Sequence, residues 1–340
     1  MLRFRFQAPF IMRTGYGKLG CWLAKCFLER NDIQVDVAAH QGKIADDVPP
    51  IVSTAARDLH ESRRLGLLLS YADHMNLLPT ERKTIYTMWE TTRLPSSFVQ
   101  RMKRVDLMFA PSEFCASLFR ADVKGLRVEM VGCGVDTDFY SMGKGNDGPL
   151  TMGISGVMSP RKGIDVLLNA WRALAEKKDV CLLVKTRDTR WLPKTIPANV
   201  IIIDEDYSEE QMREFYRSLD YYVFPSRGEG FGLGPIEAAC CGVPGYATNW
   251  SGMRDYIGDH IKPIEWDRLS HPPTTAFARP QEGKWAEPSV EHLASLLIEM
   301  YNAGRPTLKR RKAVSSWARG NYSIRRVADR IVAELRGLHP

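Results

Sequence analysis

The sequence has no hydrophobic run that approaches the roughly 20 apolar residues needed to cross a bilayer. Residues 1–17 lack the apolar core and the small-residue cleavage site of a signal peptide. Seven cysteines, an odd number, show none of the Cys-x2-Cys spacing typical of a zinc site. These features argue against a membrane-spanning protein, a secreted disulfide-bonded domain and a zinc module. They predict a cytoplasmic protein with reduced thiols in its core.

Length and composition are those of a globular protein with a full core. A chain of 340 residues is long enough for about two domains. Hydrophobic residues make up 44% of it and charged residues 26%. Short apolar runs ending in turn residues alternate with stretches of helical spacing, which predicts an α/β fold with parallel sheets. The small, polar stretch 141–148 has the composition of a linker between the domains. Residues 265–288 are rich in Pro and aromatic residues with little periodicity, which predicts an extended surface segment, and two helices are expected after it.

The net charge is +7, and basic residues are concentrated at the end of the sequence. Residues 302–340 contain ten of them against Asp329 and Glu334. They are Arg305, Lys309, Arg310, Arg311, Lys312, Arg319, Arg325, Arg326, Arg330 and Arg336. The favoured interpretation is a solvated helix face, and the alternative is a patch for a polyanion. The polyanion would be nucleic acid or an anionic membrane surface.

Residues 221–240 have the pattern of a buried strand, a bare loop and a helix. Tyr221 to Phe224 are apolar or aromatic and are followed at once by Pro225 and Ser226, so we expect a buried strand that ends at a functional edge. The loop contains Gly228, Gly230, Gly232 and Gly234. Backbone amides at the start of a helix attract an anionic ligand. The stretch therefore predicts an anion site.

Two carboxylates, Glu229 and Glu237, lie within this predicted site with seven residues between them. Because an anion repels a carboxylate, we expect each one to face a neutral, hydroxyl-bearing part of the ligand. Carboxylates accept hydrogen bonds well from paired hydroxyls. A nucleotide sugar, with phosphates between ribose and a hexose, meets both demands.

This motif resembles that of a known family. Glu229 to Glu237, preceded by Pro225-Ser226 and followed by Gly242-Val-Pro244, is similar to the Glu-x7-Glu motif of retaining GT-B glycosyltransferases, especially family 4, also called group 1. The resemblance implies two Rossmann-like, doubly wound parallel-sheet domains facing across a cleft. Their expected ranges are 1–140 on the acceptor side and 150–315 for the nucleotide sugar, joined by a linker at 141–149. A last helix at 316–340 is expected to return to the first domain.

The resemblance implies a donor site made mainly by the second domain. Lys162 matches the family's diphosphate lysine, but Val157 stands where the family has an arginine, so Arg161 and Lys185 are candidates for the second positive charge. Glu237 would hold the ribose and Glu229 the transferred sugar. The donor-binding residues expected in addition are Gly15, Gly17, Gly230, Phe231, Gly232 and Leu233.

The acceptor side is expected near the carboxyl ends of the first-domain strands, where ligands bind in open α/β sheets. Tyr16 follows the first predicted strand, and Trp89-Glu90 follow another. Many family members have a histidine at that second place, so Glu90 is the predicted substitute, as a proton acceptor or a partner of a sugar hydroxyl. His74 is a second candidate, and for both His74 and Glu90 a structural hydrogen-bonding role is the commoner one for such a residue at a strand end. Glu90, Lys162 and Glu229 are the expected catalytic residues.

The expected reaction is metal-independent transfer of a hexose, with retention, from a nucleotide-diphosphate sugar to a hydroxyl of a glycan or lipid-linked glycan. No cofactor is expected, and peripheral membrane contact stays open. A modified DNA base is a second possible acceptor, because the basic tail would favour it. A nucleotide-sugar epimerase and a non-catalytic binder of nucleotide sugars are two further hypotheses for the whole protein.

Overall fold

The computed structural model describes residues 1–56, 63–71, 74, 78–273 and 282–338, with the side chains of 41–43 and 63 left out. The predicted segments 265–288 and 316–340 thus lie partly outside the described residues. The chain forms two compact units. Unit 1 comprises Met1–Trp89, Arg93–Asp136 and Tyr322–Pro340, and unit 2 comprises Glu90–Thr92 and Thr137–Asn321.

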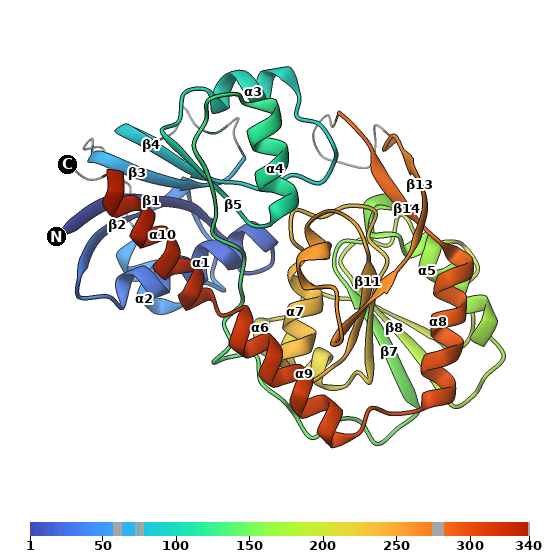
Figure 1. Cartoon of the computed structure of the whole chain (residues 1–340). Coiled ribbons are helices and arrows are strands. Elements are labelled where there is room, and N and C mark those ends of the chain that lie inside the picture. The colour runs from blue at the N-terminus through green and yellow to red at the C-terminus, as the bar shows by residue number, and fades with distance from the viewer. Residues whose placement is uncertain (57–62, 72–73, 75–77, 274–281, 339–340) are drawn as a thin grey trace. The chain divides into compact units, whose positions relative to one another are not determined.

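Unit 1 is a parallel six-stranded sheet of order β2-β1-β3-β4-β5-β6 with helices packed on it (Figure 1). Its strands are β1 (Leu2–Phe10), β2 (Ile33–Ile44), β3 (Arg63–Leu69), β4 (Thr80–Tyr86), β5 (Leu107–Ala110) and β6 (Val128–Met130). Its helices are α1 (Gly15–Leu28), α2 (Pro50–Ala55), α3 (Ser96–Met102), α4 (Glu113–Asp122) and α10 (Ile324–Leu338).

Unit 2 is a second parallel six-stranded sheet, of order β12-β11-β10-β7-β8-β9. Its strands are β7 (Leu150–Ser155), β8 (Val180–Thr186), β9 (Val200–Asp204), β10 (Tyr221–Phe224), β11 (Gly245–Thr248) and β12 (Ile261–Ile264). The 3-10 helices are η2 (Pro160–Lys162), η3 (Arg172–Leu174) and η4 (Ser251–Tyr256). The α-helices are α5 (Ile164–Trp171), α6 (Glu209–Arg217), α7 (Leu233–Cys240), α8 (Val290–Ala303) and α9 (Leu308–Asn321).

The predicted α/β class and parallel sheets are confirmed, and the reason is visible in the strands. Every residue of β7 and of β10 is buried, as expected for parallel strands covered on both faces. All seven cysteines are unbridged, six of them buried and Cys181 half-buried. Among the described residues, no helix is both long enough and apolar enough to cross a bilayer.

The predicted extended segment 265–288 is partly regular, because its described part forms two antiparallel strands, β13 (Trp266–Ser270) and β14 (Trp285–Pro288). Strands this short carry no visible periodicity, and the buried Trp285 fixes the pair by donating to Ser270 and Glu287. We also expected two helices after 288, and the structure has three. Gly304 in a left-handed conformation, followed by Pro306, separates α8 from α9.

The last helix, α10, belongs to unit 1, where it packs against α1. Six of its apolar residues recur at helical spacing and are buried. They are Ile324, Val327, Ala328, Ile331, Val332 and Leu335. In addition, Nη1 of Arg325 lies 2.9 Å from Oε2 of Glu29, and the two side chains form an ion pair. The first and last segments of the sequence are thus parts of one hydrophobic core.

Gly163 connects η2 to α5 in a left-handed conformation with a φ of 68°. A Cβ added there would lie 2.0 Å from the carbonyl oxygen of Pro225. We predict that Gly163→Ala lowers the free energy of unfolding by roughly 3 kcal/mol or more, since a steric clash adds to the ~1–2 kcal/mol cost of the left-handed conformation. Urea unfolding would measure this loss. Gly125→Ala is the control, because Gly125 also has a positive φ, 81°, and no atom lies within 4 Å of a Cβ added there. Equal losses in both variants would contradict the prediction.

Candidate functional site

Charged side chains converge beyond the carboxyl ends of β7 and β10 in unit 2. Arg161 and Lys162 come from η2, and Glu229 comes from the loop between β10 and α7. Oε1 of Glu229 lies 2.5 Å from Nη1 of Arg161 and 2.7 Å from Nζ of Lys162. The Ser226 hydroxyl donates to the same oxygen at 2.8 Å. The structure therefore brings together three of the predicted site residues and adds Ser226.

The two cations determine the protonation of Glu229, which is 7% exposed. Burial alone raises the pKa of this carboxyl group, but the opposing charges of Arg161 and Lys162 outweigh burial and lower the pKa from 4.5 to about 2. Burial also lowers the pKa of Lys162, and Glu229 opposes that change. An ionised carboxylate between two cations is thus the stable arrangement at neutral pH.

The backbone N–H and carbonyl of Glu229 both form hydrogen bonds with the first two residues of η4, the 3-10 helix after β11. Its N–H donates to Oγ of Ser251 at 2.9 Å, and its carbonyl accepts from the N–H of Gly252 at 3.0 Å. Ser251 has a φ of 53° and is the one non-glycine residue with a positive φ among those the structure describes. Such local strain is typical of functional sites. A Cβ on Gly252 would lie 2.1 Å from the carbonyl oxygen of Gly230, so the approach requires glycine.

Arg227, adjacent to the glycine loop, connects three segments and was not among the predicted site residues. Its guanidinium makes two bonds to Asp165, at 2.8 and 2.7 Å, and one to Glu287 of β14 at 2.6 Å. The guanidinium also lies over the ring of Trp285, 5.6 Å from its centroid. The backbone N–H of Arg227 donates to the carbonyl of Arg161 at 2.7 Å. The sequence separations, 62 residues to Asp165 and 60 to Glu287, explain why no local pattern revealed this network.

Glu90 groups with unit 2, although the sequence suggested an acceptor-side position for it. A Cβ on Gly228 would lie 2.2 Å from the carbonyl oxygen of Glu90, so the two backbones are in contact. Oε2 of Glu90 is buried and has no hydrogen-bond partner among the described residues. Burial raises the pKa of this carboxyl group, Arg161 opposes the shift, and Glu229 adds to it. Glu90 is therefore a neighbour of the Glu229 cluster and holds a proton more readily than an exposed glutamate.

Glu237 lies on the buried face of α7 and is 3% exposed. It accepts a hydrogen bond from the hydroxyl of Tyr216 at 2.5 Å. The Tyr216 hydroxyl also lies 3.1 Å from Oγ of Ser155, at the carboxyl end of β7. A ribose held by Glu237 would share this carboxylate with Tyr216.

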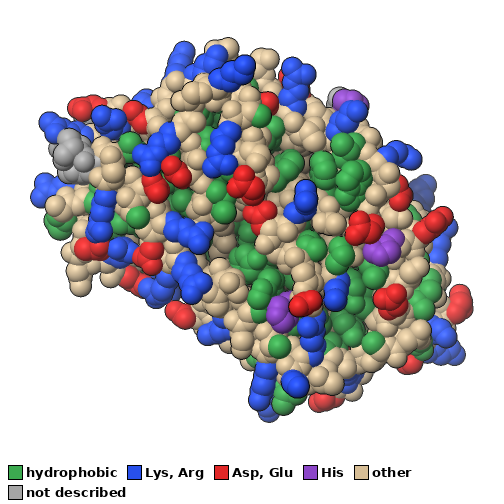
Figure 2. Space-filling model, in the orientation of Figure 1, with side chains coloured by type: hydrophobic (Ala, Val, Ile, Leu, Met, Phe, Trp, Pro, Cys, Tyr) green, Lys and Arg blue, Asp and Glu red, His purple; other side chains and the backbone are tan. Residues whose placement is uncertain are grey.

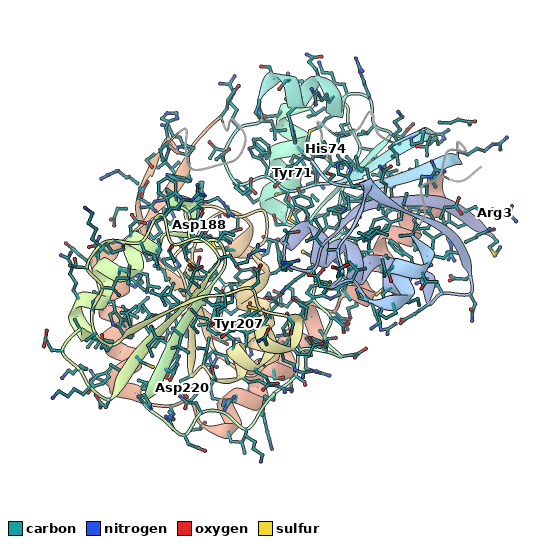
Figure 3. All side chains as sticks on the ribbon, turned by 180° about the vertical axis from the view of Figure 1, so that it is seen from behind. Arg3, Tyr71, His74, Asp188, Tyr207 and Asp220 are labelled. Atoms are coloured by element: carbon teal, nitrogen blue, oxygen red, sulfur yellow. The ribbon has the colours of Figure 1, made fainter. Side chains whose placement is uncertain are left out.

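Lys185, the other candidate for a second cation, is 4% exposed and is engaged elsewhere. Its ammonium donates to the carbonyl oxygens of Thr186 and Glu205 at 3.3 and 2.7 Å. It also lies 4.8 Å from the ring centroid of Tyr207, which is labelled in Figure 3. The structure thus places Arg161, and not Lys185, beside Lys162.

The remaining donor-side residues of unit 2 shape the loop before α7. Phe231 is 2% exposed and packs edge-on against Tyr256, with centroids 5.4 Å apart. Gly230 is buried, Gly232 has a φ of 89° at the start of α7, and Leu233 is half-buried. Among the described residues, no group of three or more His, Cys, Asp and Glu side chains could hold a metal ion.

The predicted site residues Gly15, Tyr16 and Gly17, which follow β1, and Trp89, which follows β4, lie in unit 1. Gly15 is the first residue of α1, and a Cβ added there would have no atom within 4 Å. A Cβ on Gly17, in contrast, would lie 2.0 Å from the carbonyl oxygen of Ile11. The hydroxyl of Tyr16 accepts from the N–H of Met88 at 2.8 Å. Trp89 is 2% exposed and is part of the unit 1 core. Gly17 and Trp89 thus have structural roles.

His74, also in unit 1, is half-buried within an aromatic group. Its ring lies 4.3 Å from that of His40 and 6.5 Å from that of Tyr71, and Figure 3 labels Tyr71 and His74 near one another. Nδ1 of His74 lies 2.8 Å from Oγ of Ser70. Burial, and then Arg101, lower the pKa of this imidazole. The neutral ring is therefore favoured near pH 7.

Most basic side chains of the tail are used within their own units. Seven of the ten basic residues in 302–340 hydrogen bond to backbone carbonyls or carboxylates of the same unit. They are Arg305, Arg310, Arg311 and Arg319 in unit 2 and Arg325, Arg330 and Arg336 in unit 1. On the face shown in Figure 2, basic side chains are interspersed with acidic ones. These contacts weaken the interpretation of the tail as a polyanion patch.

The chain is similar to glycosyltransferases in sequence and fold. Residues 149–276 match the family model for glycosyl transferases group 1. A D-inositol 3-phosphate glycosyltransferase of Mycobacterium sp. (strain KMS) is 28% identical over 171 residues, with 44% of this chain and 38% of that relative covered. The chain spans less than half the length of such curated relatives.

Several solved structures cover nearly the whole chain. Sucrose-phosphate synthase from Thermosynechococcus elongatus has a TM-score of 0.69 at 13% identity, with 99% of each chain covered. HepE from Anabaena, solved in complex with UDP-glucose, has a TM-score of 0.66 at 14% identity and covers 99% of this chain and 100% of its own. At such identities the likeness concerns the fold, and it establishes the predicted GT-B architecture.

The low pKa of Glu229 predicts how stability depends on pH. The pKa lies below its usual value of 4.5 in the folded state, so the ionised carboxylate stabilises the fold above pH 4.5. This contribution is lost as the pH falls toward about 2. We predict that wild type loses more unfolding free energy than Glu229→Gln as the pH falls from 7 to about 3. Urea unfolding over this range would measure the difference. Parallel curves would show that the cations do not stabilise the carboxylate.

Proposed function

Because residues 149–276 match the family model for glycosyl transferases group 1 and the chain has the GT-B fold, we propose that it transfers a hexose from a nucleotide-diphosphate sugar to a hydroxyl acceptor. The acceptor is a glycan or a lipid-linked glycan, and transfer proceeds with retention and without a metal ion. The observation that carries the proposal is the pair Arg161 and Lys162, held side by side against Glu229 beyond the strand ends of unit 2. Seven unbridged thiols favour a reducing, cytoplasmic location.

Arg161 and Lys162 would bind the diphosphate and stabilise the charge that develops on it as a leaving group. Two adjacent cations on a short rigid element can supply that charge directly. The bond between the sugar's anomeric carbon and the diphosphate oxygen breaks, and the acceptor oxygen bonds to the same carbon. The family has an arginine at the position of Val157. Arg161 would supply that positive charge instead, because it shares Glu229 with Lys162.

The carboxylates would bind the neutral ends of the donor. Glu229 would accept hydrogen bonds from the hexose hydroxyls, and Glu237 from the ribose hydroxyls. Glu90 is the candidate that receives the acceptor's proton, since its raised pKa makes its carboxylate a stronger base than an exposed one. The leaving diphosphate is the other group that can take this proton. Tyr16 and His74 are the acceptor-side candidates of unit 1.

Three competing hypotheses are separable from this proposal. The first is transfer to a modified DNA base, which was suggested by the basic residues of the tail. Most arginines of the tail hydrogen bond within the protein, so the charge of the tail no longer favours DNA as the acceptor. An epimerase would convert the donor without an acceptor. A non-catalytic binder would be stabilised by a nucleotide sugar but would not turn it over.

We predict that one nucleotide sugar among UDP, GDP and ADP derivatives raises the melting temperature and then turns over in a transfer assay. Lys162→Ala should weaken its binding roughly 10- to 100-fold, because a charge-assisted hydrogen bond contributes about 1.5–3 kcal/mol. Calorimetry would measure the affinity, with Lys262→Ala, an exposed lysine of β12, as the control. NMR of the product's anomeric proton tests retention, and activity in EDTA tests metal independence. No stabilisation by any of these donors would contradict the proposed function.

A further inference from the structure

We propose that Glu229 is a built-in competitor of the donor's diphosphate. Its carboxylate holds the same two cations, Arg161 and Lys162, that the diphosphate would use, so the two anions must exchange places during each turnover. The inference rests on the proposed function and adds to it a means of releasing the nucleoside diphosphate. It is carried by the contacts of the Glu229 side chain, of its backbone and of the two cations.

The contacts of the carboxylate are concentrated on one atom. Three donors, from Arg161, Lys162 and Ser226, lie 2.5–2.8 Å from Oε1 of Glu229. With Glu229 7% exposed and the two cationic side chains 18% and 15% exposed, solvent screens these charges little. An anion that approaches Arg161 and Lys162 therefore has to displace a carboxylate that already compensates their charge.

Both cations have a second anchor that does not involve Glu229. Nζ of Lys162 lies 4.7 Å from the ring centroid of Phe224, and Nη1 of Arg161 donates to the carbonyl of Gly228 at 2.8 Å. The two cations thus keep their positions when the carboxylate turns away. The result is a preorganised anion site that exists whether or not Glu229 occupies it.

The exchange needs only a rotation of one side chain. The N–H of Glu229 is bound by Ser251 and its carbonyl by Gly252, so the backbone stays fixed. In the donor complex the carboxylate turns from the cations to the hexose hydroxyls. After transfer the hexose has left, the carboxylate loses those partners, and its return to Arg161 and Lys162 displaces the nucleoside diphosphate.

The test compares wild type, Glu229→Gln and Glu229→Asp in calorimetric titrations with inorganic pyrophosphate, UDP, GDP and ADP. Removing the competing charge should raise the affinity for pyrophosphate, and for the nucleoside diphosphate that wild type binds, by about tenfold or more. Glu229→Asp keeps the charge on a shorter side chain and should show a smaller gain. Glu299→Gln, an exposed residue of α8, makes the same change in net charge and should show none.

Turnover should change in the opposite direction. With the nucleotide sugar that wild type uses, Glu229→Gln should lower kcat and strengthen inhibition by the nucleoside diphosphate product by a similar factor of about ten. Its melting temperature without ligand should fall, since two buried cations lose their partner, and should rise more on adding pyrophosphate than that of wild type. A variant with a purely structural defect would lose stability without binding anions more tightly.

The outcomes separate the inference from the proposed function. If wild type binds one nucleoside diphosphate and both Glu229 variants bind it equally or more weakly, the competitor role is wrong and the proposed function stands. An equal gain in Glu299→Gln would also overturn the inference, because the effect would then be one of net charge. If wild type binds none of the nucleotides or their sugars, the proposed function itself fails.

Discussion

The geometry of unit 2 depends on one carboxylate oxygen that receives three hydrogen bonds. Oε1 of Glu229 is bonded by Arg161, Lys162 and Ser226, and so it connects η2 with the loop before α7. These two segments are separated by 67 residues in the sequence. Because a buried charge is stable only when it is compensated, the carboxylate and the cations each require the other. Structure and chemistry are thus coupled at a single side chain.

Arg227 extends this coupling to the pair β13 and β14. Its bonds to Asp165 and Glu287 connect the helix that follows Lys162 with β14, and its backbone N–H bonds to Arg161. Thr92 exchanges hydrogen bonds with Lys284, at 3.0 and 2.9 Å, so the Glu90 segment is bound to the residues just before β14. Arg227 thus connects η2, α5 and β14 through hydrogen bonds.

How much could be predicted from sequence depends on the range of the interaction. β10 has the predicted bounds, and α7 begins within the predicted glycine loop, because local residue types determine a buried strand and a bare turn. Lys162 and Glu229 were predicted separately, each from a motif. Their direct contact was not, because it depends on two loops brought together by neighbouring strands β7 and β10.

The less successful predictions have the same origin. Lys185 was plausible as a second cation by position, but its ammonium bonds to Glu205, which only the pairing of β8 with β9 brings near. For the basic tail, composition counts charges without their partners, so the sequence left a polyanion patch open beside the favoured solvated helix face. A last helix returning to the first domain was expected from the family resemblance alone, and no local signal identifies α1 as the packing partner of α10.

The position of α10 has a consequence for biosynthesis. A ribosome makes residues 1–136 first, then all of unit 2, and only afterwards the helix that completes the core of unit 1. Until then the face of α1 that α10 covers stays open to water, since six apolar residues of α10 are not yet there. Unit 2, continuous apart from residues 90–92, can fold while the chain is still growing. The packing of α1 in unit 1 is thus completed only after unit 2 has been synthesised.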